Sequence, residues 1–425
     1  MKVKIFKGFN TFLKSIDVYE NNDVSGIVQE ILKKVHKNGD AALREYTEKF
    51  DKATPDTWLV PENALEEALD NLGKDLLLVL QQAADNIMLF HERQKTDSQF
   101  HFSTDGSVLG WKVTPVDSAG IYIPGGRAAY PSTLLMNAIP AQIAEVPRIA
   151  IVSPPGSSGL PHPLVMAATA FMGLKELYAV GGVQSIAALA YGTESIEKVV
   201  KITGPGNAYV VEAKRQLYGI VGIDSLAGPS EIMIVSDRQD IPVDYLVRDM
   251  LSQAEHAPDA GAFLVTTSEK QAKKVAERIK KLVPKLPRKE IIEASFSNRS
   301  AIILAKDLEE IFEIINEFAP EHLEILTKNP FEDLYKIRNA GAIFIGPNTP
   351  EPVGDYLAGP NHTLPTSGCA KFSSPLGVQD FVKTSSVISY SAERLKNQGE
   401  QIIRFAEEEE LFSHAAAIQT RLDNF

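Results

Sequence analysis

Two short segments of the chain combine residue types that can bind a metal ion or move a proton. Gln253 and His256 lie three residues apart in a stretch with helical periodicity, so both side chains leave one face of the helix. Two such ligands make half of a metal site, although a hydrogen-bonded helix face has the same spacing. Glu321 and His322 are adjacent, after Ala319–Pro320. A carboxylate beside an imidazole suits the removal of two distinct protons, and a charged pair at a helix end is the structural alternative.

Two further histidines are accompanied by carboxylates. The segment 350–368, PEPVGDYLAGPNHTLPTSG, has little predicted regular structure and includes Asp355 and His362. A stretch of this length without regular structure in a compact domain is usually functional. Glu409 and His414 lie five residues apart in an acidic C-terminal helix, where a solvated helix face is the alternative. The other histidines lack such neighbours, and we expect structural or surface positions for them: His36, His91, His101 and His162.

The glycine-rich segments do not form a familiar nucleotide-binding fingerprint. Neither G-x-G-x-x-G nor G-x-x-x-x-G-K-[ST] occurs in the chain. The glycine pairs at 125–126 and 181–182 and the segment 204–207, GPGN, remain. The last two follow strand-like runs and precede helical ones, which is where open α/β sheets bind ligands and where a helix N-terminus can receive a phosphate. Ordinary strand-to-helix turns would have the same composition.

These residues lie in a chain in which short apolar runs alternate with helical patterns. The first hundred residues read as helices, with breaks at 38–40 and near Gly73, and residues 392–422 read as one long or broken helix. Strands are predicted at 148–153, 176–180, 199–203, 231–236, 262–266, 301–304 and 342–345. Helices are predicted between several of them, at 184–191, 243–255, 271–282 and 307–318. This alternation is typical of mostly parallel, doubly wound sheets, and seven or more strands favour two of them.

Length and composition indicate a multidomain globular protein. A chain of 425 residues is too long for a single core, and its net charge of −12, without a basic run, argues against a nucleic-acid surface. One cysteine, Cys369, cannot form an internal disulfide and suits a reducing compartment. The N-terminus does not resemble a signal peptide, and no apolar stretch is long enough to span a bilayer. We therefore expect a cytoplasmic protein that binds neither nucleic acid nor membrane.

Several long glycine- and proline-rich blocks, in the same order, resemble the histidinol dehydrogenase family. They are GIYIPGGRAAYPSTLLMNAIPAQIA (120–144), AVGGVQSIAALAYGTES (179–195), ITGPGNAYVVEAKRQLYG (202–219), GIDSLAGPSEIMIVSD (222–237), DMLSQAEHAPDA (249–260), FAPEHLEI (318–325), AGAIFIG (340–346) and EPVGDYLAGPNHTLPTSGCAKFSSPLGVQDF (351–381). The resemblance covers nearly the whole chain. It implies a zinc-dependent, NAD-linked enzyme that oxidises L-histidinol to L-histidine in two steps through the aldehyde.

The resemblance also implies roles for individual residues. One zinc ion per subunit would be held by Gln253, His256, Asp355 and His414. His322 would deprotonate the alcohol and Glu321 would activate water for the second oxidation. The substrate would be surrounded by Ser230, Gln253, His256, His322, Asp355, Glu409 and His414, with Glu409 near its ammonium group. Contacts with NAD would come from Tyr122, Gln184 and Asn207.

The implied architecture is α/β, with two incomplete Rossmann-like doubly wound domains and a helical C-terminal dimerisation extension. We expect residues 15–120 with 235–375 to form the first α/β domain, which carries the zinc and base residues, and 121–234 to form the nucleotide-binding domain. Residues 376–425 with 1–14 would reach the partner subunit, so that Glu409 and His414 complete the site of the other monomer in a homodimer.

Some positions depart from the family pattern, and other functions are conceivable. The C-terminal block usually reads E-G-L-x-A-H, whereas this chain has four glutamates at 407–410, which makes the register of the ammonium-binding glutamate ambiguous. The first alternative is a related zinc- and NAD-dependent dehydrogenase of another small polar alcohol, such as a sulfonated diol. A metal hydrolase and a catalytically inactive relative are further alternatives, which the specific blocks and the intact base residues disfavour.

Overall fold

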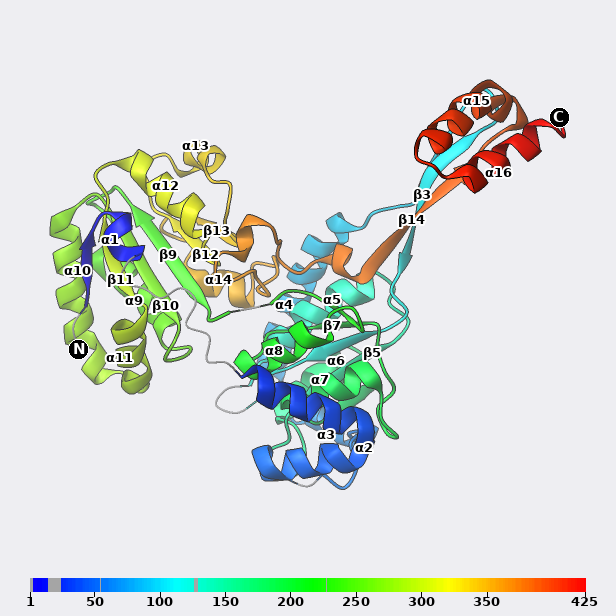
Figure 1. Cartoon of the computed structure of the whole chain (residues 1–425). Helices are drawn as coiled ribbons and strands as arrows, with labels where there is room; N and C mark the ends of the chain where they lie inside the picture. The colour runs from blue at the N-terminus through cyan, green and yellow to red at the C-terminus, as the bar shows by residue number, and fades with distance from the viewer. Residues whose placement is uncertain (1–2, 14–23, 54, 126–128, 227) are drawn as a thin grey trace. The chain divides into compact units, whose positions relative to one another are not determined.

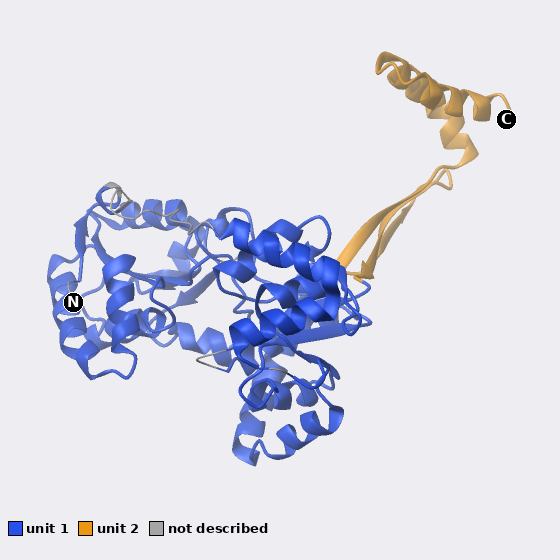
Figure 2. Ribbon diagram, turned by 60° about the horizontal axis from the view of Figure 1, so that its bottom comes forward, with its two compact units in different colours: residues 1–94, 117–381 blue, residues 95–116, 382–425 orange. Residues whose placement is uncertain are grey.

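The computed structural model describes residues 3–13, 24–53, 55–125, 129–226 and 228–425. The chain divides into two compact units (Figure 2). The first comprises Met1–Gln94 and Asp117–Phe381, and the second comprises Lys95–Val116 and Val382–Phe425. We describe each unit by itself.

A six-stranded parallel sheet forms one half of the first unit (Figure 1). Its strands, in spatial order, are β1 (Ile5–Lys7), β11 (Ala301–Leu304), β10 (Gly261–Thr266), β9 (Glu231–Ser236), β12 (His322–Ile325) and β13 (Ala342–Ile345). Helices α9 (Val243–Ala254), α10 (Glu269–Leu282) and α11 (Lys289–Asn298) share an apolar core with one face of this sheet. The core of the opposite face includes α1 (Phe9–Leu13) and α12 (Leu308–Phe318). Helices on both faces make the sheet doubly wound, and this explains why most residues of its central strands are buried and apolar.

A five-stranded parallel sheet forms the other half of the first unit. Its spatial order is β6 (Glu176–Ala179), β5 (Ile149–Ser153), β4 (Ala119–Tyr122), β7 (Lys201–Thr203) and β8 (Gly222–Ile223). Its crossover helices are α5 (Pro131–Ile143), α6 (Pro163–Phe171), α7 (Gly182–Tyr191) and α8 (Ala208–Leu217). The helices at the start of the chain pack on these: α2 (Ser25–Asp51) on α7 and α8, α3 (Glu62–Asp70) on α6, and α4 (Lys74–His91) on α5.

The second unit is a small antiparallel sheet followed by two helices. Its strands are ordered β14 (Val382–Ser389), β3 (Val108–Pro115) and β2 (Gln99–Phe102). Helices α15 (Ala392–Glu408) and α16 (Phe412–Leu422) pack against each other. Glu410, in the turn between them, has a left-handed backbone with φ of 59°. The C-terminal helix expected at 392–422 is therefore broken into two.

The α/β class with two doubly wound parallel sheets, predicted from the sequence, is confirmed. The grouping of the segments differs from the expected domains. Of the segment expected at 15–120 in the first domain, residues 15–23 and 54 lie outside the described residues. Helices α2, α3 and α4 pack on the helices of the five-stranded sheet instead, with the buried side chains of α2 in a core with α7 and α8, and Lys95–Val116 belong to the second unit. β9 begins at Glu231, so the expected boundary at 234/235 falls inside a strand of the six-stranded sheet.

The expected C-terminal extension also differs in composition from the second unit. Residues 1–14 were expected in it, but β1 pairs with β11 from Ile5↔Ile302 to Lys7↔Leu304 in the six-stranded sheet. The strand partners of β14 are β3 and β2, which come from residues 99–115 rather than from the N-terminus. In both cases, strand pairing between residues far apart in the sequence determines which sheet a segment joins. Within the described residues, no helix is long and apolar enough to cross a membrane.

Candidate active site

The Glu–His pair lies at the start of β12, which the sequence did not predict as a strand. α12 ends at Phe318, Ala319 takes a left-handed backbone with φ of 54°, and Pro320 follows. The chain then enters β12 between β9 and β13, with His322 opposite Ile232 and Ala342. Glu321 and His322 are 6% and 4% exposed, so both bases are buried at the amino end of the sheet.

The hydrogen bonds of His322 define which of its ring nitrogens can act as a base. Nδ1 lies 3.1 Å from the backbone carbonyl oxygen of Glu231. Because a carbonyl only accepts hydrogen bonds, Nδ1 carries the proton of the neutral ring and Nε2 keeps its lone pair. Burial lowers the pKa of the imidazole, more than the nearby carboxylate of Asp355 and the bond to Glu231 raise it. His322 is thus neutral near pH 7, with Nε2 ready to accept a proton.

Glu321 is held by two donors on one oxygen. Its Oε2 accepts hydrogen bonds from Ser230 Oγ at 2.6 Å and from the backbone N–H of Glu231 at 2.8 Å. Burial nevertheless raises the pKa of the carboxyl to about 8, since desolvation outweighs these two bonds. Glu321 and His322 therefore differ in protonation near neutral pH, and the carboxyl becomes a base only when it is ionised.

The raised pKa of Glu321 predicts a pH-dependent loss of stability in the metal-free protein. Between its ordinary pKa of 4.5 and about 8, the folded state keeps a proton that the unfolded state has lost. The contribution of protonated Glu321 to the free energy of unfolding is therefore complete below pH 4.5, and it is lost as the pH rises through 8. Glu321→Gln mimics the protonated acid, so the fall in melting temperature from pH 5.5 to 8.5 should shrink by roughly 2–5 °C. An exposed glutamate, Glu332→Gln, is the control, and an unchanged fall in the Glu321 variant would contradict the assignment.

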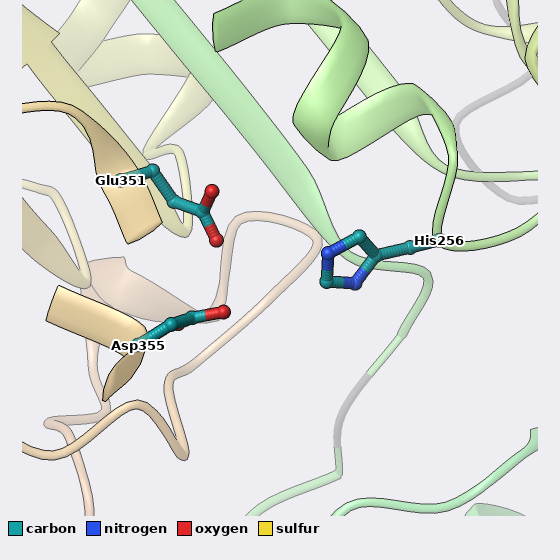
Figure 3. A group of neighbouring side chains, drawn as sticks. All are labelled: His256, Glu351 and Asp355. Atoms are coloured by element: carbon teal, nitrogen blue, oxygen red, sulfur yellow. The ribbon is translucent and has the colours of Figure 1, made fainter. Parts of the chain in front are cut away.

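Three side chains that could bind a metal ion, from two helical regions, converge near Glu321 and His322. Atoms of His256, Glu351 and Asp355 lie within 4.8 Å of one another, and Figure 3 shows both carboxylates pointing toward the imidazole. His256 follows the end of α9, where its N–H donates to the carbonyl of Gln253 at 3.2 Å. Helix α14 (Glu351–Tyr356) supplies the two carboxylates four residues apart, on one face. This segment was expected to lack regular structure, so the helix is a correction.

Gln253 adds a fourth candidate ligand atom, its side-chain amide oxygen Oε1. Its Nε2 donates to Ser230 Oγ at 2.9 Å, which orients the amide. The side chain is fully buried, and Oε1 has no hydrogen-bond partner among the described residues. A buried amide oxygen left unpaired is costly unless a ligand engages it. The chemistry of Gln253, His256 and Asp355 therefore fits a bound cation, the role that the family resemblance implies for them, and this role stays a prediction.

Glu351 is a candidate ligand that the sequence reasoning missed. It is 2% exposed, Oε1 lacks a partner among the described residues, and burial together with the carboxylate of Asp355 raises its pKa to about 10. A divalent cation would favour the ionised forms of both carboxyls. The Glu351–Asp355 spacing could have revealed it, but only once the Pro- and Gly-containing segment was known to be a helix.

His362, in the same segment, supports Asp355. Its Nδ1 lies 3.1 Å from the backbone carbonyl of Asp355 and its Nε2 lies 3.2 Å from Thr133 Oγ1. The ring thus links the loop after α14 to the first turn of α5. His91 is fully buried, and its Nδ1 lies 3.0 Å from the carbonyl of Ile87, as expected for a structural histidine.

The two remaining predicted site residues belong to the second unit. Glu409 follows the last turn of α15 and His414 lies in α16, and both are exposed. They are thus not among the side chains that the first unit brings together. Their expected role in the site of a partner subunit stays a prediction.

The three residues predicted to contact NAD lie at the carboxyl edge of the five-stranded sheet. Tyr122 ends β4, Gln184 lies in the first turn of α7, and Asn207 precedes α8. The chain order of the strands reverses between β4 and β7, and open α/β sheets bind ligands at such a switch point. At Gly204, with φ of 112°, a Cβ atom would lie 2.2 Å from the Tyr122 carbonyl oxygen, so glycine is required there.

These residues differ in how much of their polar capacity is already used. Both amide atoms of Gln184 are buried without a partner among the described residues, and so is the hydroxyl of Thr203, which ends β7. Asn207 Oδ1 instead caps α8 by accepting from the N–H groups of Tyr209 and Val210, both at 3.1 Å. Burial raises the pKa of Tyr122 to about 12, so it stays protonated. Among these residues, Gln184 and Thr203 thus carry the polar atoms without a partner in the described part of the chain, and Thr203 had not been predicted.

Two doubly wound parallel sheets, with a buried Glu–His pair beside side chains that could hold a metal ion, are the architecture and candidate site of an α/β enzyme. The family model described as histidinol dehydrogenase matches residues 16–422. The histidinol dehydrogenase of Bacillus subtilis is 49% identical over 423 residues, covering 99% of each chain, and that of Geobacillus kaustophilus is 47% identical over 423 residues, covering 100% of this chain and 99% of the relative. A crystal structure of histidinol dehydrogenase from Elizabethkingia anophelis matches with a TM-score of 0.93 at 34% identity, covering 99% of this chain and 98% of the other. The chain belongs to the histidinol dehydrogenase family and is an oxidoreductase.

Proposed function

We propose that the protein catalyses the zinc-dependent, NAD-linked oxidation of L-histidinol to L-histidine through the aldehyde. The observation that carries the proposal is the adjacency of two buried bases with different proton affinities, Glu321 and His322. Beside them lie candidate metal ligands, of which the oxygens Gln253 Oε1 and Glu351 Oε1 lack a partner among the described residues. Removal of protons from two differently placed oxygens is what a two-step oxidation of an alcohol needs.

Zinc is the cation that this donor set fits, with imidazole nitrogen, carboxylate oxygen and amide oxygen as ligands. Gln253, His256 and Asp355 would hold it, with Glu351 adjoining and His414 contributed by the second unit of a partner subunit. Bound zinc would hold the amine and imidazole nitrogens of the substrate and so fix the alcohol carbon in position. Bound NAD would accept one hydride in each of the two oxidations.

In the first oxidation, His322 Nε2 takes the hydroxyl proton as the carbon loses its hydride. The Nδ1 bond to the Glu231 carbonyl keeps the ring in the required tautomer, and this bond strengthens when the ring becomes cationic. In the second oxidation, the ionised Glu321 takes a proton from the water that adds to the aldehyde. The resulting hydrate anion then loses the second hydride to become the carboxylic acid, which releases its remaining proton to water and leaves as the carboxylate.

Other residues of the proposal orient the substrate and the cofactor. Ser230 connects the proposed bases with the proposed metal ligands, because its hydroxyl donates a hydrogen bond to Glu321 and accepts one from Gln253. Glu409 of a partner subunit would pair with the substrate ammonium. NAD would lie at the switch point of the five-stranded sheet, against Tyr122, Gln184 and Asn207.

A single assay tests the proposal. The purified protein with zinc, NAD and L-histidinol should form about two NADH per alcohol consumed. Chelation should abolish turnover, and readdition of zinc should restore it. Production of NADH from a sulfonated diol but not from L-histidinol would overturn the substrate assignment and leave the class of enzyme intact.

A further inference from the structure

The backbone of Glu231 hydrogen-bonds with the side chains of both proposed bases. It opens β9, beside the start of β12. Its N–H donates to Glu321 Oε2 at 2.8 Å, and its carbonyl oxygen lies 3.1 Å from His322 Nδ1. Both peptide units that flank this Cα atom therefore bear on the chemistry: a rotation there changes the carboxylate and imidazole contacts together.

The side chain of Glu231 is fully buried and is anchored at both oxygens. Oε1 accepts from the backbone N–H of Ser367 at 3.0 Å, and Oε2 accepts from a terminal nitrogen of Arg299 at 2.9 Å. Arg299 lies just before β11, and its side chain is 15% exposed. The anchors come from two separate segments, so they fix the side chain against the sheet from two directions.

A glycine lets this ion pair span an intervening strand. Gly261 of β10 pairs with Glu231 of β9. Arg299 caps the end of α11, two residues before β11, and β11 is the other neighbour of β10. A Cβ atom at Gly261 would lie 2.7 Å from the Phe263 ring and 3.4 Å from Glu231 Cβ. A side chain at position 261 would therefore crowd Phe263 and Glu231, and glycine leaves the room that the Glu231–Arg299 ion pair occupies.

We propose that the Glu231–Arg299 pair is a positioning device, which holds the first peptide units of β9 in the orientation that sets the His322 tautomer and aligns Glu321. This inference rests on the proposed function, in which Glu321 and His322 are the bases. Arg299 is hydrogen-bonded to Glu231 rather than to either base, and its charge also lowers the pKa of Glu321. Arg299→Lys keeps that charge, so a loss in this variant reports on the geometry of the pair. Burial raises the pKa of Glu231 to about 7 even though the charge of Arg299 lowers it, which agrees with a carboxylate that depends on this partner.

Kinetics of paired variants tests the device. Glu231→Gln places an amide donor against the guanidinium, and Arg299→Met removes the cation, whereas Arg299→Lys keeps it without the forked geometry. We expect kcat with L-histidinol to fall about 10–100-fold in Glu231→Gln and Arg299→Met, with KM values changed less than about threefold. Arg299→Lys should recover part of the loss.

Arg148→Met is a matched control, because Arg148 is 18% exposed in an ion pair with Glu176 on the other sheet. It should lower the melting temperature as Arg299→Met does, with kcat unchanged. Equal kcat values for wild type, Glu231→Gln and Arg299→Lys would overturn the inference, as would losses confined to stability. The two conservative variants carry the test if Arg299→Met does not fold.

A readout that needs no substrate separates this inference from the proposed function. In protein labelled with 15N-histidine, the His322 ring should show the Nδ1–H tautomer, and Glu231→Gln should weaken that preference. An inactive wild type with this spectrum and this change would refute the proposed function and keep the positioning device. An active wild type whose His322 signals and kcat are unaltered by Glu231→Gln would do the reverse.

Discussion

Replacing His322 with glutamine is expected to slow the oxidation of L-histidinol by about 10²–10⁴-fold, the usual contribution of a general base. Nε2 is the lone pair that the structure leaves free on the ring, and glutamine offers no group that can accept a proton there. Oxidation of the aldehyde should suffer less, because its proton goes to Glu321. The measurement is the initial rate of NADH formation, with L-histidinol and then with L-histidinal as the substrate.

The matched variant is Glu321→Gln, which keeps an oxygen for the Ser230 and Glu231 donors but removes the base. Its aldehyde oxidation should fall by a similar factor, about 10²–10⁴-fold, while the first hydride transfer falls less. His101→Gln, at an exposed histidine of β2, should leave both rates unchanged. If the two site variants slow both oxidations equally, the division of labour between Glu321 and His322 is wrong.

The local periodicity of the sequence predicted the elements that are long or strongly patterned. β5, β9, β11 and β13 fall within one residue of their predicted bounds, since each is a continuous apolar run. β12 was missed because its four residues, HLEI, include two polar side chains that the sheet buries at a functional edge. α14 was missed because Pro352 and Gly354 are residues typical of loops, although proline is well accommodated in the first turn of a helix.

The candidate site was only partly accessible from the sequence. Gln253 and His256 stand out by their spacing, and the family blocks supplied Asp355, but Glu351 joins them only through the fold. The Glu231–Arg299 pair joins residues 68 positions apart and has no local signature. The tautomer of His322 depends on a carbonyl of another strand, so no sequence pattern could have indicated it.

The two sheets present their candidate ligands from opposite ends. The NAD residues follow the carboxyl ends of strands in the five-stranded sheet, as open α/β folds lead one to expect. The proposed bases lie at the amino end of β12 in the six-stranded sheet: Glu321 precedes the strand and His322 is its first residue. Peptide groups at the start of a strand, such as those of Glu231, therefore orient the proposed bases here. In most open α/β folds, loops at the carboxyl ends of the strands hold the functional side chains.

The exposed positions of Glu409 and His414 in the second unit motivate a test of shared sites. His414 is a predicted zinc ligand without a buried neighbourhood of its own, and the metal group of the first unit contains only residues from within that unit. If the second unit of one subunit completes the site of another, each site draws residues from two chains. Two different inactive chains can then form one intact site between them.

Mixing inactive His322→Ala protein with inactive His414→Ala protein, after reversible dissociation, is expected to restore about a quarter of the wild-type activity. Random pairing makes about half of the dimers mixed, and each mixed dimer holds one site with an intact His322 from one chain and an intact His414 from the other. NADH formation before and after mixing measures the recovery. Mixing His322→Ala with Glu321→Ala is the control, because both changes lie in the first unit and every site then keeps a defect. Verified mixed dimers without activity would mean that each chain supplies its own His414, or that His414 is not a ligand.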